Sequence, residues 1–162
     1  MVARITYPDQ GSLLMMFDYK DGLLFWKEGV PNKVKTRSVA MTFTNGYMGI
    51  RFDGHAFLLH RLIFLYHHGY LPAFVDHINA DKRDNRIENL RACTHSQNHA
   101  ARRSSNTTHR GVYQSNGKWR ARIKVRGIYK HLGSFMSRSE AAEAYNSAAL
   151  QHFGEFAILN EV

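Results

Sequence analysis

Four Asx-Gly pairs divide this chain into short runs and restrict the folds open to it. Asp21-Gly22, Asn45-Gly46, Asp53-Gly54 and Asn116-Gly117 each lie next to apolar or aromatic stretches. Such pairs tolerate positive φ and suit two-residue β-hairpin loops. Residues 11–55, which contain the runs LLMMF, LLFW, VAMTF and YMGIRF, are therefore predicted to be β-structure.

Two stretches have helical periodicity instead. Residues 56–69, AFLLHRLIFLYHHG, repeat leucines at helical spacing, with Gly69 as the C-cap. Residues 137–154 begin with Ser137 and Glu140 at capping-box spacing and end at Gly154. Between residues 110 and 135, turns at 116–117 and 127 separate three predicted strands. The predicted fold class is α+β.

The net charge indicates the kind of molecule that this protein binds, and the cysteine content limits the metal sites that it can form. The chain has 162 residues, 44% of them hydrophobic, and a net charge of +9. Such a basic excess favours a polyanion, nucleic acid before an anionic membrane. No run of about 18 apolar residues and no secretory signal is present, so no membrane partner is expected. Cys93 is the single cysteine, which excludes a multi-cysteine zinc site and favours a cytoplasmic location.

The segment VDHINADKRDNRIENLRACTHSQN, residues 75–98, is almost entirely polar. It follows the pattern strand, loop, strand, helix, and Thr94 and Gln97 again have capping-box spacing. Asp76, at the end of the first strand, and Asn98, in the helix, are expected to converge as hard oxygen ligands for one Mg²⁺ or Mn²⁺. His77 faces the other side of the strand and suits a general base that activates water.

This segment also has other possible interpretations. A solvated loop with an incidental histidine fits the composition. An EF-hand does not fit, because the sixth position from Asp76 is not glycine. His95 and His99 are four residues apart on the predicted helix, but they lack a third zinc ligand.

The segment resembles the core of the HNH endonucleases, specifically the phage-type homing nucleases with a ββα-metal fold. The resemblance covers roughly residues 11–103. It implies that His77 is the water-activating base, that Asp76 and Asn98 hold one divalent cation, and that Asn89 clamps the loop. Arg102 stands where other branches carry a further histidine. Arg83, Arg86 and Arg91 are candidate phosphate contacts.

A second basic motif lies in the predicted sheet. In KWRARIKVR, one face carries Trp119, Ala121, Ile123 and Val125 and is expected to pack on the Ala-rich helix. The other face is expected to carry a row of cations, Arg120, Arg122, Lys124 and Arg126, for phosphates or bases.

Residues 108–160 resemble the plant Apetala-two-type (ethylene-response-factor) DNA-binding domain, with HRGV, KWRARI, HLGSF, EAAEAYNSAA and FGEFAILN as the matching motifs. That family lays a three-stranded sheet in the major groove. The resemblance implies a DNA-binding set on the sheet and beside it: Arg110, Tyr113, Arg120, Arg122, Lys124, Arg126, Tyr129, Lys130 and His131.

Taken together, residues 1–103 are expected to form a nuclease domain with its ββα-metal core at about 73–103. Residues 104–107 are expected to form a linker, and residues 108–162 a DNA-binding domain. The predicted activity is metal-dependent hydrolysis of a phosphodiester in double-stranded DNA by a homing-type nickase. An inactive DNA-binding regulator and an RNA-binding module are the alternatives. No small-molecule substrate and no oligomer are indicated, and a phage-encoded protein would act in the bacterial cytoplasm.

Overall fold

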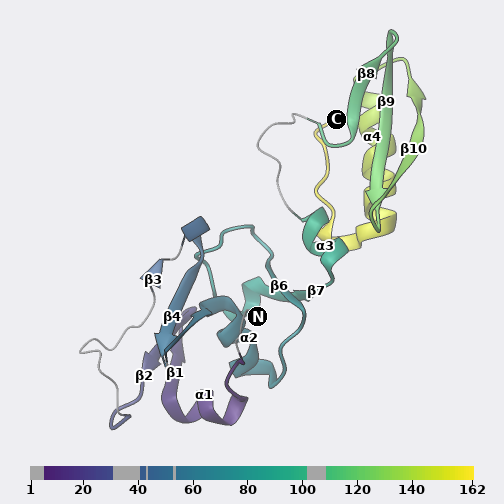
Figure 1. Cartoon of the computed structure of the whole chain (residues 1–162). Coiled ribbons are helices and arrows are strands. Elements are labelled where there is room, and N and C mark those ends of the chain that lie inside the picture. The colour runs from purple at the N-terminus through teal and green to yellow at the C-terminus, as the bar shows by residue number, and fades with distance from the viewer. Residues whose placement is uncertain (1–5, 31–40, 43, 53, 102–108) are drawn as a thin grey trace. The chain divides into compact units, whose positions relative to one another are not determined.

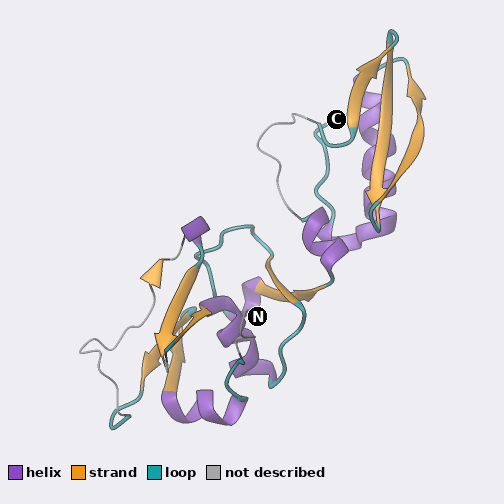
Figure 2. Cartoon of the chain, in the orientation of Figure 1, coloured by secondary structure: helices purple, strands orange, loops and turns teal. Residues whose placement is uncertain are grey.

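The computed structural model describes residues 6–30, 41–42, 44–52, 54–101 and 109–162 (Figure 1). The chain forms two compact units, Met1–Cys93 and Thr94–Val162. Both mix helices with small antiparallel sheets, which confirms the α+β class (Figure 2). The linker predicted at residues 104–107 lies outside the described residues, so that boundary stays a prediction. None of the described helices combines the length and apolar character needed to cross a membrane.

The first unit contains eleven elements within its described residues. In chain order they are α1 (Gln10–Met16), β1 (Phe17–Lys20), β2 (Leu23–Trp26), β3 (Met41–Thr42), η1 (Thr44–Gly46), β4 (Met48–Phe52), β5 (His55–Leu58), α2 (Leu59–His68), β6 (Phe74–His77), η2 (Ile87–Asn89) and β7 (Leu90–Cys93). The strands form three sheets: β1–β2, β3–β4–β5 and β6–β7. The hairpin predicted at Asp21-Gly22 is confirmed, with φ of 48° and 78°.

The first apolar run is helical and not extended, so the predicted β-structure of residues 11–16 is wrong. Asp9 caps α1, because its carboxylate accepts a hydrogen bond from the Ser12 peptide N–H at 2.8 Å. Leu13 is then fully buried in the core. An apolar run of five residues, LLMMF, is equally compatible with either element, and here the cap and the packing of α1 beside α2 make its first four residues helical.

The central helix α2 is shorter than the predicted one. Residues 55–58 pair with β4 as β5, and the helix begins at Leu59. Its C-cap is Gly69, with φ of 73°, as predicted. Leu62 and Ile63 are fully buried, and α2 contributes a larger share of the core than any strand of this unit. The helix thus supplies the apolar surface on which the small sheets pack.

The second unit has the predicted order of strands and helix. It contains α3 (His95–Ala100), β8 (Val112–Ser115), β9 (Lys118–Val125), β10 (Ile128–Phe135), α4 (Arg138–Phe153) and η3 (Gly154–Phe156). The strands pair antiparallel in the order β10–β9–β8, and α4 packs on them (Figure 1). Both predicted capping boxes are confirmed, Thr94–Gln97 on α3 and Ser137–Glu140 on α4.

The tightest backbone approach in this unit is at Gly111. A Cβ there would lie 2.2 Å from the Arg122 carbonyl oxygen and 2.5 Å from the Tyr145 ring, and φ is +64°. We expect Gly111→Ala to lower the free energy of unfolding by about 2–5 kcal/mol, from positive φ and overpacking together. Gly117→Ala, at φ +72° with no atom within 4 Å, should cost only about 1–2 kcal/mol. Denaturant unfolding of both variants checks this, and equal losses would contradict the steric argument.

Candidate functional site

The β6–β7 hairpin presents Asp76 and His77 to different surroundings. Asp76 is paired with Arg91 across the hairpin, and His77 with Leu90. Neighbouring residues of a strand point to opposite faces. His77 is therefore buried, with 6% of its surface exposed, whereas Asp76 is half-buried on the other face.

A buried amide that the sequence analysis did not single out holds one nitrogen of His77. Nε2 of His77 lies 2.9 Å from Oδ1 of Asn85, which is 1% exposed. The Asn85 Nδ2 donates to the Arg83 carbonyl oxygen and to Sδ of Met48, which sets the direction of the amide. An amide oxygen only accepts, so Nε2 carries the proton. Nδ1 of the neutral imidazole then carries the lone pair.

The β1–β2 hairpin packs against the backbone at Asn85 and holds it in position. The β1–β2 turn approaches so closely that a Cβ on Gly22 would lie 2.7 Å from the Arg86 nitrogen. The Tyr19 hydroxyl accepts a hydrogen bond from the Ile87 peptide N–H at 3.0 Å. No local pattern distinguishes Asn85 from the exposed polar residues around it, which is why sequence reasoning missed it.

His60, to which the sequence analysis assigned no role, packs on the His77 ring. The two ring centroids are 5.0 Å apart, and Tyr47 lies 5.3 Å from His60 and 6.2 Å from His77. Burial, followed by the neighbouring His77 and Arg61, lowers the pKa of His60 to about 3. His60 is thus neutral near pH 7 and adds no positive charge beside His77.

Asn89 ties the polar loop to the start of β7. Its Oδ1 accepts from the Asn79 peptide N–H at 3.0 Å, and its Nδ2 donates to the Asn79 Oδ1 at 3.0 Å and the Asp84 carbonyl oxygen at 2.7 Å. The Ile78 peptide N–H also donates to the Asn89 carbonyl oxygen. Asn89 is 7% exposed, and its hydrogen-bonding groups are matched by loop partners. This is the geometry of a loop clamp.

Asp76 is partly engaged by a neighbouring cation. Nε and Nη2 of Arg91 donate to the same carboxylate oxygen, Oδ2, at 3.1 and 3.0 Å. The other oxygen, Oδ1, takes no part in these bonds. Asn98 is half-buried on α3 in the second unit, and its amide makes no hydrogen bond to another described residue. Joint coordination by Asp76 and Asn98 therefore stays a prediction.

The donor chemistry of this pair fits a hard divalent cation. A carboxylate oxygen and an amide oxygen suit Mg²⁺ or Mn²⁺, and Mg²⁺ commonly keeps several waters besides one or two carboxylates. Throughout the described residues, no three His, Cys, Asp or Glu side chains gather as a metal cluster. Burial raises the pKa of the Cys93 thiol to about 11, so this thiol stays protonated and is a poor metal ligand.

The three arginines predicted to contact phosphate have different surroundings. Arg83 is exposed. Arg86 is exposed too, but it forms a two-point ion pair with Asp84, which holds the pKa of the Asp84 carboxyl well below its usual range. Arg91 is committed to Asp76 and is only 14% exposed. Arg83 is the most available of the three for a phosphate.

In the second unit, one sheet face gathers aromatic and cationic side chains. Directly opposed strand residues face the same way, so the register aligns Tyr113 with Arg120, Tyr129 with Lys124 and His131 with Arg122. The Arg122 guanidinium lies over two rings, 5.0 Å from Tyr113 and 4.6 Å from Tyr129. We call these six residues the outer face; the opposite face packs on α4 through Ala121 and Ile123.

The structure places two members of the predicted DNA-binding set off the outer face. Arg126 lies in the β9–β10 turn with φ of 50°, outside the strand row, because β9 ends at Val125. Lys130 is opposite Ile123 in the register, which places it on the α4 side of the sheet. Arg110 is held in place, since its guanidinium donates to the Ala100 carbonyl oxygen and its peptide N–H donates to Oδ1 of Asn160.

Comparison with known families identifies the class of domain. Residues 57–100 match the family described as HNH endonuclease, a segment that contains Asp76, His77, Asn89 and Asn98. The segment that contains these four residues therefore matches an HNH endonuclease domain. The resemblance noted for the polar segment is confirmed at this level.

Two relatives extend the comparison. The chain is 32% identical over 117 residues to a protein named as an uncharacterized HNH endonuclease of Acanthamoeba polyphaga mimivirus, covering 70% of this chain and 62% of that protein. Over 40 residues it is 55% identical to an ethylene-responsive transcription factor-like protein of Arabidopsis thaliana, covering 25% of this chain and 18% of the plant protein. The chain thus spans less than two thirds of either relative.

Proposed function

We propose that this protein is a metal-dependent endonuclease of homing type that hydrolyses one phosphodiester in double-stranded DNA. The observation that carries the proposal is the hydrogen bond from Nε2 of His77 to Oδ1 of Asn85. This bond orients an imidazole whose second nitrogen is left to accept a proton. The residue that precedes His77 is Asp76, which supplies a carboxylate. The HNH endonuclease match over residues 57–100 supports the reaction class.

In the proposed reaction, Nδ1 of His77 takes a proton from water as the water oxygen attacks phosphorus. The bond from phosphorus to the 3′ oxygen breaks, and that oxygen leaves. Nε2–H of His77 keeps its hydrogen bond to Asn85 throughout, so the imidazolium that forms remains oriented and partly stabilised. The neutral His60 beside it avoids repulsion of this new charge.

Asp76 and Asn98 are the residues that would hold Mg²⁺ or Mn²⁺. Such an ion, when bound, acts as a Lewis acid that neutralises charge developing on the phosphate and the leaving oxygen. Arg91 orients the Asp76 carboxylate by donating to Oδ2, which leaves Oδ1 for coordination.

Asn85 acts through His77 and is a positioning residue. We expect Asn85→Ala to slow cleavage by about 10- to 100-fold, by analogy with residues that orient metal-bound histidines. Asn85→Asp keeps an acceptor for Nε2–H but adds negative charge, which favours the protonated imidazole. The acid limb of its pH–rate profile should therefore move to higher pH. A merely structural role would leave the shape of that profile unchanged in both variants.

We further propose that the outer face of the second unit binds duplex DNA. The outer face contains three cationic side chains and two tyrosines. The Arg122 guanidinium lies over both tyrosine rings, which lowers the entropic cost of ordering its side chain when DNA binds. The short match to a plant protein named as transcription factor-like supports a nucleic-acid partner for this region. The unit would hold the nuclease domain on its substrate.

The two faces of the sheet offer a matched pair of lysines for a test. We expect Lys124→Ala to reduce the slope of log affinity against log salt by about 0.9, the contribution of one phosphate contact to B-DNA. Lys130→Ala, on the α4 side, should leave the slope unchanged. Fluorescence anisotropy across a salt series measures both. Equal effects of the two variants would contradict the proposed surface.

Cleavage of supercoiled plasmid with and without Mg²⁺ tests the activity itself. Only one set of Asp76, His77, Asn89 and Asn98 is present, and one set addresses one phosphodiester at a time. Open-circular DNA should therefore accumulate first, with linear DNA late if at all. Binding without any cleavage would favour an inactive DNA-binding regulator, and prompt linear product would overturn the nickase.

A further inference from the structure

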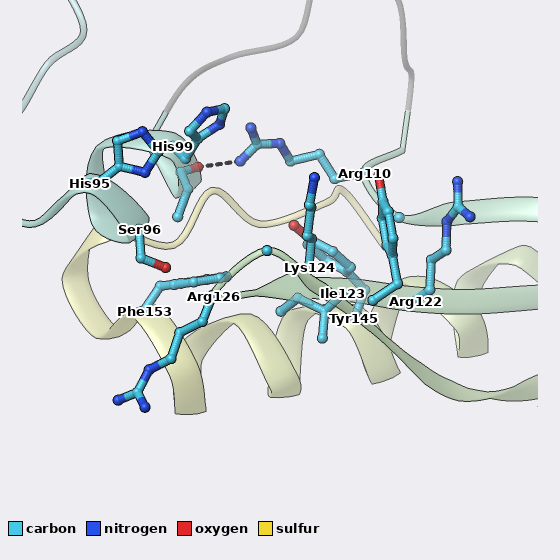
Figure 3. Close-up of a pocket in the computed structure, with 14 residues that line it drawn as sticks. His95, Ser96, His99, Arg110, Arg122, Ile123, Lys124, Arg126, Tyr145 and Phe153 are labelled. Carbon is cyan, nitrogen blue, oxygen red and sulfur yellow. Dashed lines mark hydrogen bonds between the residues drawn. The ribbon is translucent and has the colours of Figure 1, made fainter.

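The second unit contains a cavity of about 600 Å³ where β9 runs on beyond the end of β8 (Figure 3). The β8–β9 pairing ends at Val112 and Ala121, and the Gly111 carbonyl oxygen then accepts the Arg122 peptide N–H at 2.8 Å. Past this point the edge of β9 faces an open space. In Figure 3, α3 with His95 and His99 borders one side of it and β9 with Lys124 the other.

The floor and rim of this cavity differ in chemistry. The floor is apolar, with Ala100, Ile123, Tyr145 and Phe153 each at most 9% exposed. The rim is lined by Arg110, Arg122, Lys124 and Arg126; in Figure 3 Arg110 extends toward α3, whereas the Arg126 guanidinium points away from Arg110 and Lys124. Among the described residues that line the cavity, none is acidic. A ligand that matches both parts has a flat apolar body and an anionic group.

The corner of the cavity at Arg110 is pre-organised. Its guanidinium bonds the Ala100 carbonyl oxygen of α3, and its main chain is clamped by Asn160, whose Nδ2 donates to the Arg110 carbonyl oxygen at 3.1 Å. Burial raises the pKa of the neighbouring Tyr145, so its hydroxyl stays protonated and adds no negative charge. A cavity held open by its own hydrogen bonds requires little ordering when a ligand enters.

We infer that this cavity binds one nucleoside monophosphate unit, its base on the apolar floor and its phosphate at the cationic rim. The volume lies within the range of small-ligand sites, roughly 300–1,000 Å³. Arginine forks and aromatic surfaces are the groups that bind phosphate and bases. The biological source rests on the proposed action on DNA: the unit is either a free mononucleotide or an unpaired nucleotide of a DNA strand.

The first experiment measures binding of deoxyadenosine monophosphate to the full chain by calorimetry, without DNA. We expect saturable binding, with inorganic phosphate and deoxyadenosine each binding at least tenfold more weakly. Ser96→Phe, which fills the cavity from α3, should weaken binding at least tenfold. Ser147→Phe, on an exposed position of α4 that does not line the cavity, should leave it unchanged. Lys124→Gln, a milder change, should weaken it about tenfold while preserving the fold.

The second experiment distinguishes the two sources. A duplex with one unpaired nucleotide is compared with the fully matched duplex. Tighter binding of the former, lost in Ser96→Phe, identifies a nucleotide of the strand as the ligand; no difference identifies the free mononucleotide. No saturable binding of the monophosphate, or equal binding by wild type and Ser96→Phe, would overturn the inference. Plasmid cleavage is measured separately, so a negative result for the cavity and a negative result for the endonuclease activity can be distinguished.

Discussion

The variant His77→Ala is expected to lose cleavage on the order of 10²- to 10⁴-fold while binding duplex DNA as tightly as the wild type. Nδ1 of His77 acts on water, and a group that acts on water contributes little to the affinity for DNA. The hydrogen bond between Nε2 of His77 and Asn85 orients the ring, and both residues are buried, so this bond makes no contact with DNA. Rate and affinity should therefore separate in this variant.

Single-turnover cleavage and anisotropy on one duplex measure both quantities. His68→Ala is the matched control, because His68 is exposed at the end of α2, where its ring packs on Phe64. It should cut at the wild-type rate. Circular dichroism tests whether the fold of His77→Ala is retained once the buried ring is removed. Cleavage by His77→Ala within a few-fold of wild type would remove His77 from its proposed role.

Removal of divalent cations is expected to abolish cleavage, and Mg²⁺ or Mn²⁺ to restore it. A bound cation contributes several kcal/mol of charge stabilisation to such a transition state, which corresponds to at least about 10²–10³ in rate. The proposed ligands, Asp76 and Asn98, are oxygen donors. Zn²⁺ should therefore fail to restore activity at stoichiometric concentration. Activity with stoichiometric Zn²⁺ and none with Mg²⁺ would contradict this ligand set.

The variant Asp76→Asn should shift the Mg²⁺ dependence of cleavage to higher concentration and lower the maximal rate. Asparagine keeps the shape of the side chain, so the half-buried Arg91 retains an acceptor. Asp18→Asn on β1 is the control, since its carboxylate is exposed and forms only a long ion pair of 3.7 Å with Lys27. Thermal unfolding of both variants separates a loss of metal affinity from a loss of stability.

The predictions that held depend on short stretches of chain. A capping box needs only residues i and i+3, so Thr94–Gln97 and Ser137–Glu140 were visible in the sequence. The alternation in β9 places Ala121 and Ile123 inside because side chains of a strand alternate by geometry. The polar segment at 75–98 was assigned to a nuclease core by its resemblance to the HNH endonucleases, and the match over residues 57–100 agrees.

The predictions that failed involve elements whose form depends on distant partners. Residues 11–16 became helical because Asp9 caps α1 and Leu13 packs in the core beside α2. Residues 55–58 form strand β5 because pairing with β4 provides hydrogen-bond partners for their peptide groups. Arg126 left the cation row because the β9–β10 turn requires positive φ at its position.

The chemical groups of the proposed site can be read from the order of the amino acids: an imidazole next to a carboxylate, two asparagines and a basic strand. Their orientations, in contrast, depend on contacts that form when the chain folds. Asn85 reaches Nε2 of His77 because the β1–β2 turn, more than sixty residues earlier, supports its backbone, and Arg91 reaches Asp76 through strand register. Hydrogen bonds of this kind act over about 3 Å, whereas local sequence patterns describe neighbours along the chain. Contacts between distant segments therefore exist only once the core has brought those segments together.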